Sequence, residues 1–503
     1  MISRAFKVSS IAAAALLAAC GGGDSVSPTP TPTPPVSVAP STEAALDAVK
    51  GFLAKRDAQV ATAMPATGAA AFSLSDGCSL ADGRSKAYSV DEFDKEPQAV
   101  ARSQADLGST RTAPVVVAER SATNADLTTR REIDIQYAIN YKDGTKDEVA
   151  EQTIISGSSS GAKMADGSTC ATPDSKSDWR FYGNRKVVRT LVNAVNERII
   201  RLALATGADL SPKVVYSKYL NLTVSDPANV ATYAIITGPG LSVSTTGAAG
   251  SLKLLSVRLL RTAPELAGKR GNVVDWRDVD GWRMCLNAAG NNGAAADTAD
   301  CVANGGTGNT WGSYNNTSGA ALDTSFATLN IKAGDVYTIA VYNDDGWKTV
   351  NGQLGKTPIA TYSNVLRALP FSAATLAGTN PDTDLFPRFT SSTKTFEEIA
   401  TGIRAKAAIA TDITWSKPGA MPDGRATQLA DTVQFEQGPA NTNGTTFPRS
   451  RSLFIGYPGA SATSATFSLP VPVTALVLPT FASFALDYNN RNGNNVSTSY
   501  AWQ

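Results

Sequence analysis

The sequence predicts a mainly β chain in which a small α+β domain is followed by two β-sandwich domains. Its 503 residues are enough for about three domains of ordinary size. A long helical pattern and several strand patterns occupy residues 43–210, whereas short apolar runs separated by Gly, Asn, Asp and Pro fill the remainder. We therefore expect folded domains at residues 43–210, 211–370 and 371–503, with the last boundary near Pro370.

The N-terminal residues carry the pattern of an exported, anchored protein. Arg4 and Lys7 precede an apolar run that is too short to span a bilayer. Leu17-Ala18-Ala19-Cys20 resembles the lipobox of bacterial lipoproteins, whose cysteine becomes the lipid-bearing first residue. The resemblance implies a signal peptide over residues 1–19, lipidation of Cys20 and sorting to the outer membrane, facing the periplasm or the outside. The alternative is an ordinary secretory signal with a chance cysteine.

A Pro-rich linker follows the expected anchor, so that residues 20–42 form a tether. The linker contains the alternating run Pro28-Thr29-Pro30-Thr31-Pro32-Thr33-Pro34-Pro35. Such a run cannot bury a core and extends as polyproline II at about 3.1 Å per residue. We expect it to hold the folded domains away from the lipid surface.

The first domain combines one helix with antiparallel strands. Residues 42–64 predict a helix with an apolar face, formed by Ala45, Leu46, Val49, Phe52 and Leu53. Further patterns predict an alternating strand, an Asp-Gly hairpin turn, a return strand and a later strand, at residues 133–141, 142–145, 148–155 and 179–184. Residues 187–205 fit helical and strand spacing equally, so their structure stays undecided.

The order of these elements is similar to the cone-shaped, nuclear-transport-factor-like domains of some bacterial lipoproteins. The resemblance covers residues 43–205 and rests on the helix, the curved antiparallel strands and the final Trp179-Arg180-Phe181-Tyr182-Gly183-Asn184 segment. It implies a pocket between helix and sheet, although no matching polar constellation is evident in the sequence.

The two following domains consist mostly of short strands. Their spacing favours β-sandwiches of immunoglobulin-like architecture, with one helix at residues 395–408. The expected strands lie at residues 219–224, 231–237, 252–260, 335–342, 432–436, 452–456, 465–469, 475–478 and 481–486.

Composition excludes several classes of function. A net charge of +1 with mixed acids and bases gives no electrostatic footprint for nucleic acid. The absence of histidine excludes Ser-His-Asp and Cys-His catalysis and the common zinc sites. Carboxylate chemistry, Ser-Lys chemistry and oxygen-ligated metals such as Ca2+ remain, but no spacing singles out a catalytic pair.

Four cysteines remain after Cys20, and an oxidising compartment favours two disulfides. Three pairings are open. Sequence proximity and the expected domain limits favour Cys78 with Cys170 and Cys285 with Cys301.

The middle domain holds the densest group of candidate site residues. Exposed tryptophans could stack on sugar rings, and the candidates are Trp276, Trp282, Trp311 and Trp347. Three carboxylates at short spacing could bind Ca2+, namely Asp275, Asp278 and Asp280. The alternatives are core packing for most of the tryptophans and a solvated turn for the carboxylates, and both are favoured.

By elimination we expect a non-enzymatic, lipid-anchored cell-envelope protein that binds a glycan or another envelope protein. The alternatives are a carboxylate-dependent glycan hydrolase and a structural scaffold for another envelope protein. Apart from the candidate Ca2+, no cofactor is expected.

Overall fold

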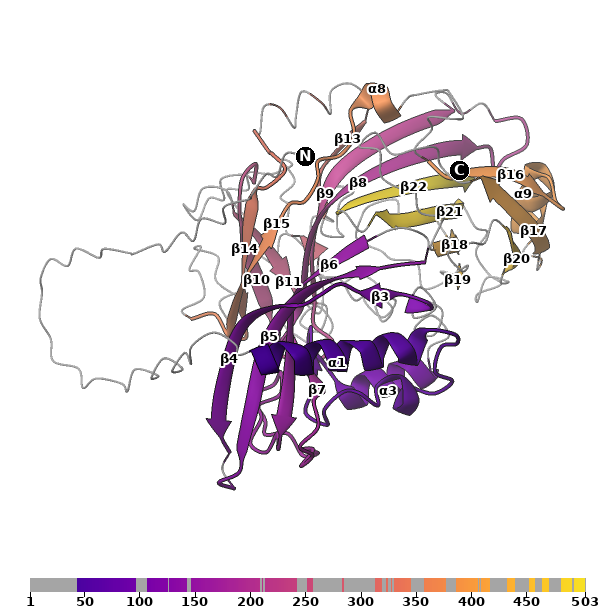
Figure 1. Ribbon diagram of the computed structural model, residues 1–503. Coiled ribbons are helices and arrows are strands. Elements are labelled where there is room, and N and C mark those ends of the chain that lie inside the picture. Colours follow the sequence, from indigo (N-terminus) through magenta and orange to yellow (C-terminus); the bar gives the residue numbers. More distant parts are fainter. Residues whose placement is uncertain are drawn as a thin grey trace, which may run out of the picture. The chain divides into compact units, whose positions relative to one another are not determined.

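The fold is mainly β and contains several antiparallel sheets (Figure 1), which confirms the predicted class at that level. It is described from a computed structural model. The described residues are 43–95, 106–124, 126–142, 146–208, 210, 213–241, 251–256, 283–284, 313–318, 323, 327, 330–344, 357–376, 386–405, 407, 409–416, 432–438, 452–456, 464–469, 481–490 and 493–502.

The predicted first helix is confirmed as α1, Glu43–Val60, and it packs on a sheet. Val49, Phe52 and Leu53 share an apolar core with Ile133, Ile135 and Ile154. The sheet has the order β3-β5-β6-β7, with β4 also paired to β5. Its strands are β3 (Thr110–Arg111), β4 (Val115–Thr123), β5 (Thr129–Asn140), β6 (Lys146–Gly157) and β7 (Arg180–Gly183).

The predicted hairpin is confirmed by the antiparallel pairing of β5 with β6, while its turn at residues 143–145 lies outside the described residues. Shorter elements connect α1 to the sheet, namely α2 (Gly68–Ala71), β1 (Leu80–Ala81), β2 (Arg84–Ser85) and α3 (Lys86–Lys95). The Cys78–Cys170 disulfide is present, with the two Cα atoms 5.7 Å apart, as sequence proximity predicted.

The segment left undecided between helix and strand is a strand, β8 (Arg189–Leu202), because it has hydrogen-bonded neighbours on both sides. It belongs to a seven-stranded sheet of order β13-β9-β8-β22-β21-β18-β19. The other strands are β9 (Val214–Ser225), β13 (Ser313–Ser318), β18 (Thr432–Gly438), β19 (Ser452–Gly456), β21 (Phe481–Asn490) and β22 (Asn494–Trp502).

This sheet takes strands from all three segments that were expected to be separate domains. β8 comes from the first and β9 from the second, whereas β22, which runs parallel to β8, comes from the last. Residues 38–503 form one compact unit. The segments on either side of the boundaries expected at residues 210 and 370 therefore contribute strands to the same hydrogen-bonded sheet.

Two smaller sheets pack on the seven-stranded sheet. A five-stranded sheet shares one apolar core with β8 and β9. In the order β12-β11-β10-β14-β15 its strands are Arg283–Met284, Ser251–Leu255, Tyr233–Thr237, Val336–Tyr342 and Ala360–Val365. A second core joins β21 and β22 to α9 (Phe396–Ala405), which confirms the predicted helix at residues 395–408. The same core includes β17 of a three-stranded sheet, whose order β16-β17-β20 corresponds to Arg388–Ser392, Ile409–Ser416 and Ser464–Leu469. The remaining element is α8 (Ala373–Leu376). The strand expected at residues 475–478 lies outside the described residues.

Candidate functional site

The site residues expected in the middle domain cannot be placed, because Trp276, Trp282, Trp311, Trp347, Asp275, Asp278 and Asp280 lie outside the described residues. The same holds for Cys20, Cys285 and Cys301. These expectations stay predictions. The candidate site below is built from residues that the structure describes.

A polar cluster lies between α1 and the sheet of the first domain. We call it the α1 cluster and define it as Arg56, Asp57, Asp106, Arg111 and Tyr137. Arg56 continues the apolar stripe of α1, since it follows Phe52 by four residues and precedes Val60 by four. A charged residue in this position therefore points toward the core side of the helix.

Two ion pairs connect α1 to the chain segment at residues 106–111. Arg56 Nη2 donates to Asp106 Oδ2 at 3.2 Å. Arg111 Nη1 donates to Asp57 Oδ1 at 2.6 Å, and the Arg111 backbone N–H donates to Asp57 Oδ2 at 3.1 Å. The Arg111 side chain is only 4% exposed, so this pair lies in the interior. The cluster thus holds two positive and two negative groups.

Burial sets the protonation behaviour of the cluster. It raises the pKa of Tyr137, and the positive charge and hydrogen bond of Arg111 oppose that rise. Burial also lowers the pKa of Arg56, while Asp106 acts against this shift and the like charge of Arg111 adds to it. The two guanidinium groups therefore lie close enough to repel each other around one neutral phenol.

Ser109 adds an unsatisfied hydroxyl beside the α1 cluster. The residue is 1% exposed, and its Oγ has no hydrogen-bond partner among the described residues. Its backbone N–H donates to the Asp106 carbonyl at 2.9 Å, and the neighbouring Gly108 N–H donates to the Val60 carbonyl at the end of α1. Native proteins leave few buried polar groups unpaired, and such groups are often associated with function.

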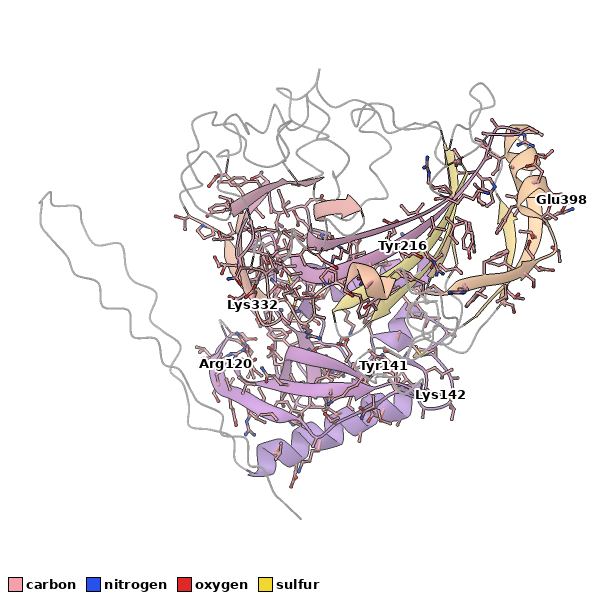
Figure 2. All side chains as sticks on the ribbon, turned by 90° about the horizontal axis from the view of Figure 1, so that it is seen from above. Arg120, Tyr141, Lys142, Tyr216, Lys332 and Glu398 are labelled. Atoms are coloured by element: carbon pink, nitrogen blue, oxygen red, sulfur yellow. A yellow bond between two sulfur atoms is a disulfide. The ribbon has the colours of Figure 1, made fainter. Side chains whose placement is uncertain are left out.

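The residues that follow β5 lie beside the α1 cluster. Figure 2 labels Tyr141 and Lys142 where β5 ends near α1. Lys142 lies close to Gly108, since a Cβ built on that glycine would be 3.5 Å from the lysine Cδ. A lysine near the carbonyl end of a helix is favoured by the helix dipole.

The α1 cluster and Ser109 bring guanidinium, phenol and hydroxyl groups together at the edge of an apolar core, and these groups are buried or half-buried. In the described part of the chain, no group of three or more His, Cys, Asp or Glu residues could hold a metal ion. The sequence analysis did not predict this cluster. The position of Arg56 on the apolar stripe of the helix could have indicated it, because a charged residue there needs buried partners.

A second group of buried polar residues surrounds the disulfide. We call it the disulfide clasp and define it as residues 76–79 and 170–174 with the Cys78–Cys170 bond. Besides the bond, the Gly77 N–H donates to Asp174 Oδ2 at 2.9 Å and Thr172 Oγ1 donates to the Gly77 carbonyl at 3.3 Å. The clasp therefore fixes two segments that are distant in sequence.

Asp76 is fully buried within the clasp. Its Oδ1 accepts a hydrogen bond from the Cys78 N–H at 2.7 Å, and its Oδ2 makes no hydrogen bond of ordinary geometry to any described residue. Burial raises the pKa of Asp76; the Ser159 hydroxyl and the Cys78 N–H oppose this rise, and Asp174 adds to it. A raised pKa is typical of a general acid, and Asp76 is fully buried in this structure.

Replacement of Asp76 by Asn is expected to stabilise the protein near neutral pH. The raised pKa means that the folded state holds the Asp76 proton more tightly than the unfolded state. The resulting stability is fully present below the unfolded pKa and is lost as pH rises through the folded pKa. Asp76→Asn keeps an oxygen that accepts the Cys78 N–H. Because the Asn side chain is neutral at every pH, the variant does not lose stability as pH rises. The melting temperature should exceed that of the wild type by roughly 1–3 °C at pH 7 and approach it near pH 4.

Asp178→Asn is the matched control for that experiment, since Asp178 is an exposed carboxylate of the neighbouring segment. Its melting temperature should follow the wild type at every pH. A difference between Asp76→Asn and wild type that does not vary with pH would contradict the assigned role of the Asp76 proton.

Comparison with protein-family models, curated proteins and solved structures finds no match to this chain. Among the described residues, no helix is both long enough and apolar enough to cross a membrane.

Proposed function

We propose that the protein is a non-enzymatic cell-envelope protein, anchored in the outer membrane through lipid on Cys20, that binds a glycan ligand. The observation that carries the binding role is the buried, unpaired Ser109 hydroxyl beside the α1 cluster, which a ligand reaches only when the segment at residues 106–111 moves away from α1. In that state a bound hydroxyl group would replace the hydrogen bonds to water that the Ser109 hydroxyl loses on folding. The tryptophans expected in the middle domain are a second candidate surface for the same ligand class.

The charge balance of the α1 cluster supports a neutral ligand. Two arginines and two aspartates cancel, so the cluster offers hydrogen bonds without a net field. A sugar presents many hydroxyl groups that both donate and accept, which matches these groups. The immunoglobulin-like arrangement of the later strands is likewise proposed, and it is supported by the core that the seven-stranded and five-stranded sheets enclose.

The binding role is tested by thermal melting of the full chain with peptidoglycan fragments and a panel of oligosaccharides. A ligand at a hundred times its dissociation constant stabilises the folded state by about 2.7 kcal/mol, which raises the melting temperature by several degrees. The absence of a shift with every sugar would overturn the glycan proposal and favour a protein partner.

Ser109→Ala separates binding at the α1 cluster from binding elsewhere. Without ligand, the variant is expected to be more stable by up to about 1 kcal/mol, because an unpaired buried hydroxyl is removed. With a sugar that binds the wild type, its ligand-induced shift should be clearly smaller. Ser73→Ala is the control, since this exposed hydroxyl accepts from Gln59 Nε2 near α1. An unchanged shift in Ser109→Ala would exclude the α1 cluster and direct attention to the tryptophans.

A further inference from the structure

We infer that Lys218 and Asp323 become joined by an intramolecular isopeptide bond, an amide between the lysine Nζ and the aspartate Cγ. The structure shows the two groups as an ion pair, which is the state before the bond forms. This modification goes beyond the proposed binding function and does not depend on it. It is assigned from the contact between the two side chains, the burial of the lysine and the groups that hold its amine in place.

The backbone brings the two residues together. Lys218 lies on β9, where its partner on the neighbouring strand β13 is Thr317. β13 ends at Ser318, so the chain leaves that strand beside Lys218 and then reaches Asp323. Lys218 Nζ donates to Asp323 Oδ1. The amine nitrogen thus contacts an oxygen that is bonded directly to the carbon it attacks.

Lys218 lies on a face of β9 that is otherwise apolar at this point. Its side chain is 4% exposed. Residues two positions apart share a face of a strand, and these neighbours are Leu220, which is fully buried, and Tyr216, which packs on Phe386. Taking an ammonium and a carboxylate out of water costs free energy, and an amide carries neither charge. The Asp323 side chain is 42% exposed, so the water that the reaction releases can leave.

The backbone of Phe371 holds the amine in place. Its carbonyl accepts a hydrogen bond from Lys218 Nζ at 3.1 Å, and its N–H donates to Asn196 Oδ1 at 2.8 Å. Asn196 is fully buried and is the partner of Lys218 on β8. The Phe371 peptide group is therefore fixed from two sides and keeps Nζ against Asp323. Well-oriented groups within one molecule react as though present at about 10⁵–10⁸ M.

The reaction balances as a condensation within the ion pair. One proton moves from the ammonium to the carboxylate, which gives an amine and a carboxylic acid. The Nζ lone pair attacks Cγ of Asp323, and the bond from Cγ to the hydroxyl oxygen breaks with its electron pair. The departing hydroxide takes a second proton from Nζ and leaves as water. The amide nitrogen keeps the third proton, which the Phe371 carbonyl accepts. No oxidant, reductant or second substrate is required.

The amide would link two positions that are 105 residues apart. Because it contains no sulfur, a reductant that opens the Cys78–Cys170 disulfide leaves it intact. The two covalent links can therefore be distinguished in one sample.

Peptide mapping of the full-length protein tests the proposal. The protein is unfolded, reduced, alkylated and digested with trypsin, which does not cut after an acylated lysine. The wild type should yield one branched peptide that contains Lys218 and Asp323 and is lighter by one water than its two parts. The exposed ion pair Lys50–Asp47 is the internal control and should show no loss of water.

Two outcomes would overturn the proposal. Separate peptides for Lys218 and Asp323, with no loss of water, would show an ion pair only. A branched peptide that is lighter by one ammonia would assign the bond to an amide side chain such as Asn196 instead of Asp323.

Lys218→Met and Asp323→Ala supply the second readout. The first removes the nucleophile and keeps an unbranched side chain, and the second removes the carboxyl group. Neither variant should yield the branched peptide, whereas Lys213→Met, which changes an exposed lysine just before β9, should retain it. A branched peptide that persists in Asp323→Ala would exclude Asp323 as the residue joined to Lys218. If the variants fail to fold, the wild-type map alone decides.

Discussion

Deletion of the last strand, residues 494–503, is expected to abolish folding of the seven-stranded sheet. β22 occupies the middle of that sheet, where it pairs along its whole length with β21 on one side and β8 on the other. Val496, Tyr500 and Trp502 are all buried. Each such side chain contributes roughly 1.5–3 kcal/mol by burial alone, so the total is comparable to the whole stability of an ordinary domain.

This expectation is checked by circular dichroism and urea unfolding of the shortened protein. The shortened chain should show no cooperative transition and should aggregate, because β8 and β21 become unpaired edges. Trp502→Ala is a milder test, with an expected loss of about 3–5 kcal/mol. Ser499→Ala, on the opposite face of the same strand, should change stability by less than about 1 kcal/mol. A cooperative transition in the deletion variant would show that the ladder can close without β22.

Loss of the disulfide through Cys78→Ala with Cys170→Ala is expected to destabilise the protein by about 4–5 kcal/mol. The bond closes a loop between residues 92 positions apart, and a cross-link of that span strongly restricts the unfolded chain. The Cys78 side chain also contributes to a small core with Ile155 and Tyr182.

The measurement is urea unfolding of the double variant, monitored by hydrogen exchange of the first domain. Protection should fall in β6 and β7, which flank the clasp, and should be retained in β21 and β22. Wild-type protein reduced and alkylated at both cysteines should behave as the double variant does. An unchanged midpoint would mean that the hydrogen bonds of the clasp alone hold the two segments together.

Local features of the fold could be predicted from the sequence. The 3.6-residue spacing of Val49, Phe52 and Leu53 predicted α1, and the period of two at Ile133 and Ile135 predicted β5, because each period reports one buried face. The Cys78–Cys170 pairing followed from proximity. These signals operate within tens of residues, where one element and its neighbour decide the outcome.

Long-range pairing could not be predicted in the same way. The segment that became β8 fits helical and strand spacing equally, and its strand identity depends on β9 and on β22. Polar residues also occupy positions that face a core, where the pattern predicts apolar ones. Arg56 lies on the apolar stripe of α1, and the seven-stranded sheet buries Asn196, Arg198 and Lys218. Their partners come from distant segments, so the period of the local sequence does not reveal them.

The parallel pairing of β8 with β22 also determines when the seven-stranded sheet can be completed during synthesis. Arg198 and Thr498 are 300 positions apart yet lie within one ladder. During synthesis from the N-terminus, β8 keeps one open edge until residues 494–502 have been made. A chain that stops before β22 keeps that edge, and we expect it to be cleaved by proteases faster than a chain that contains β22.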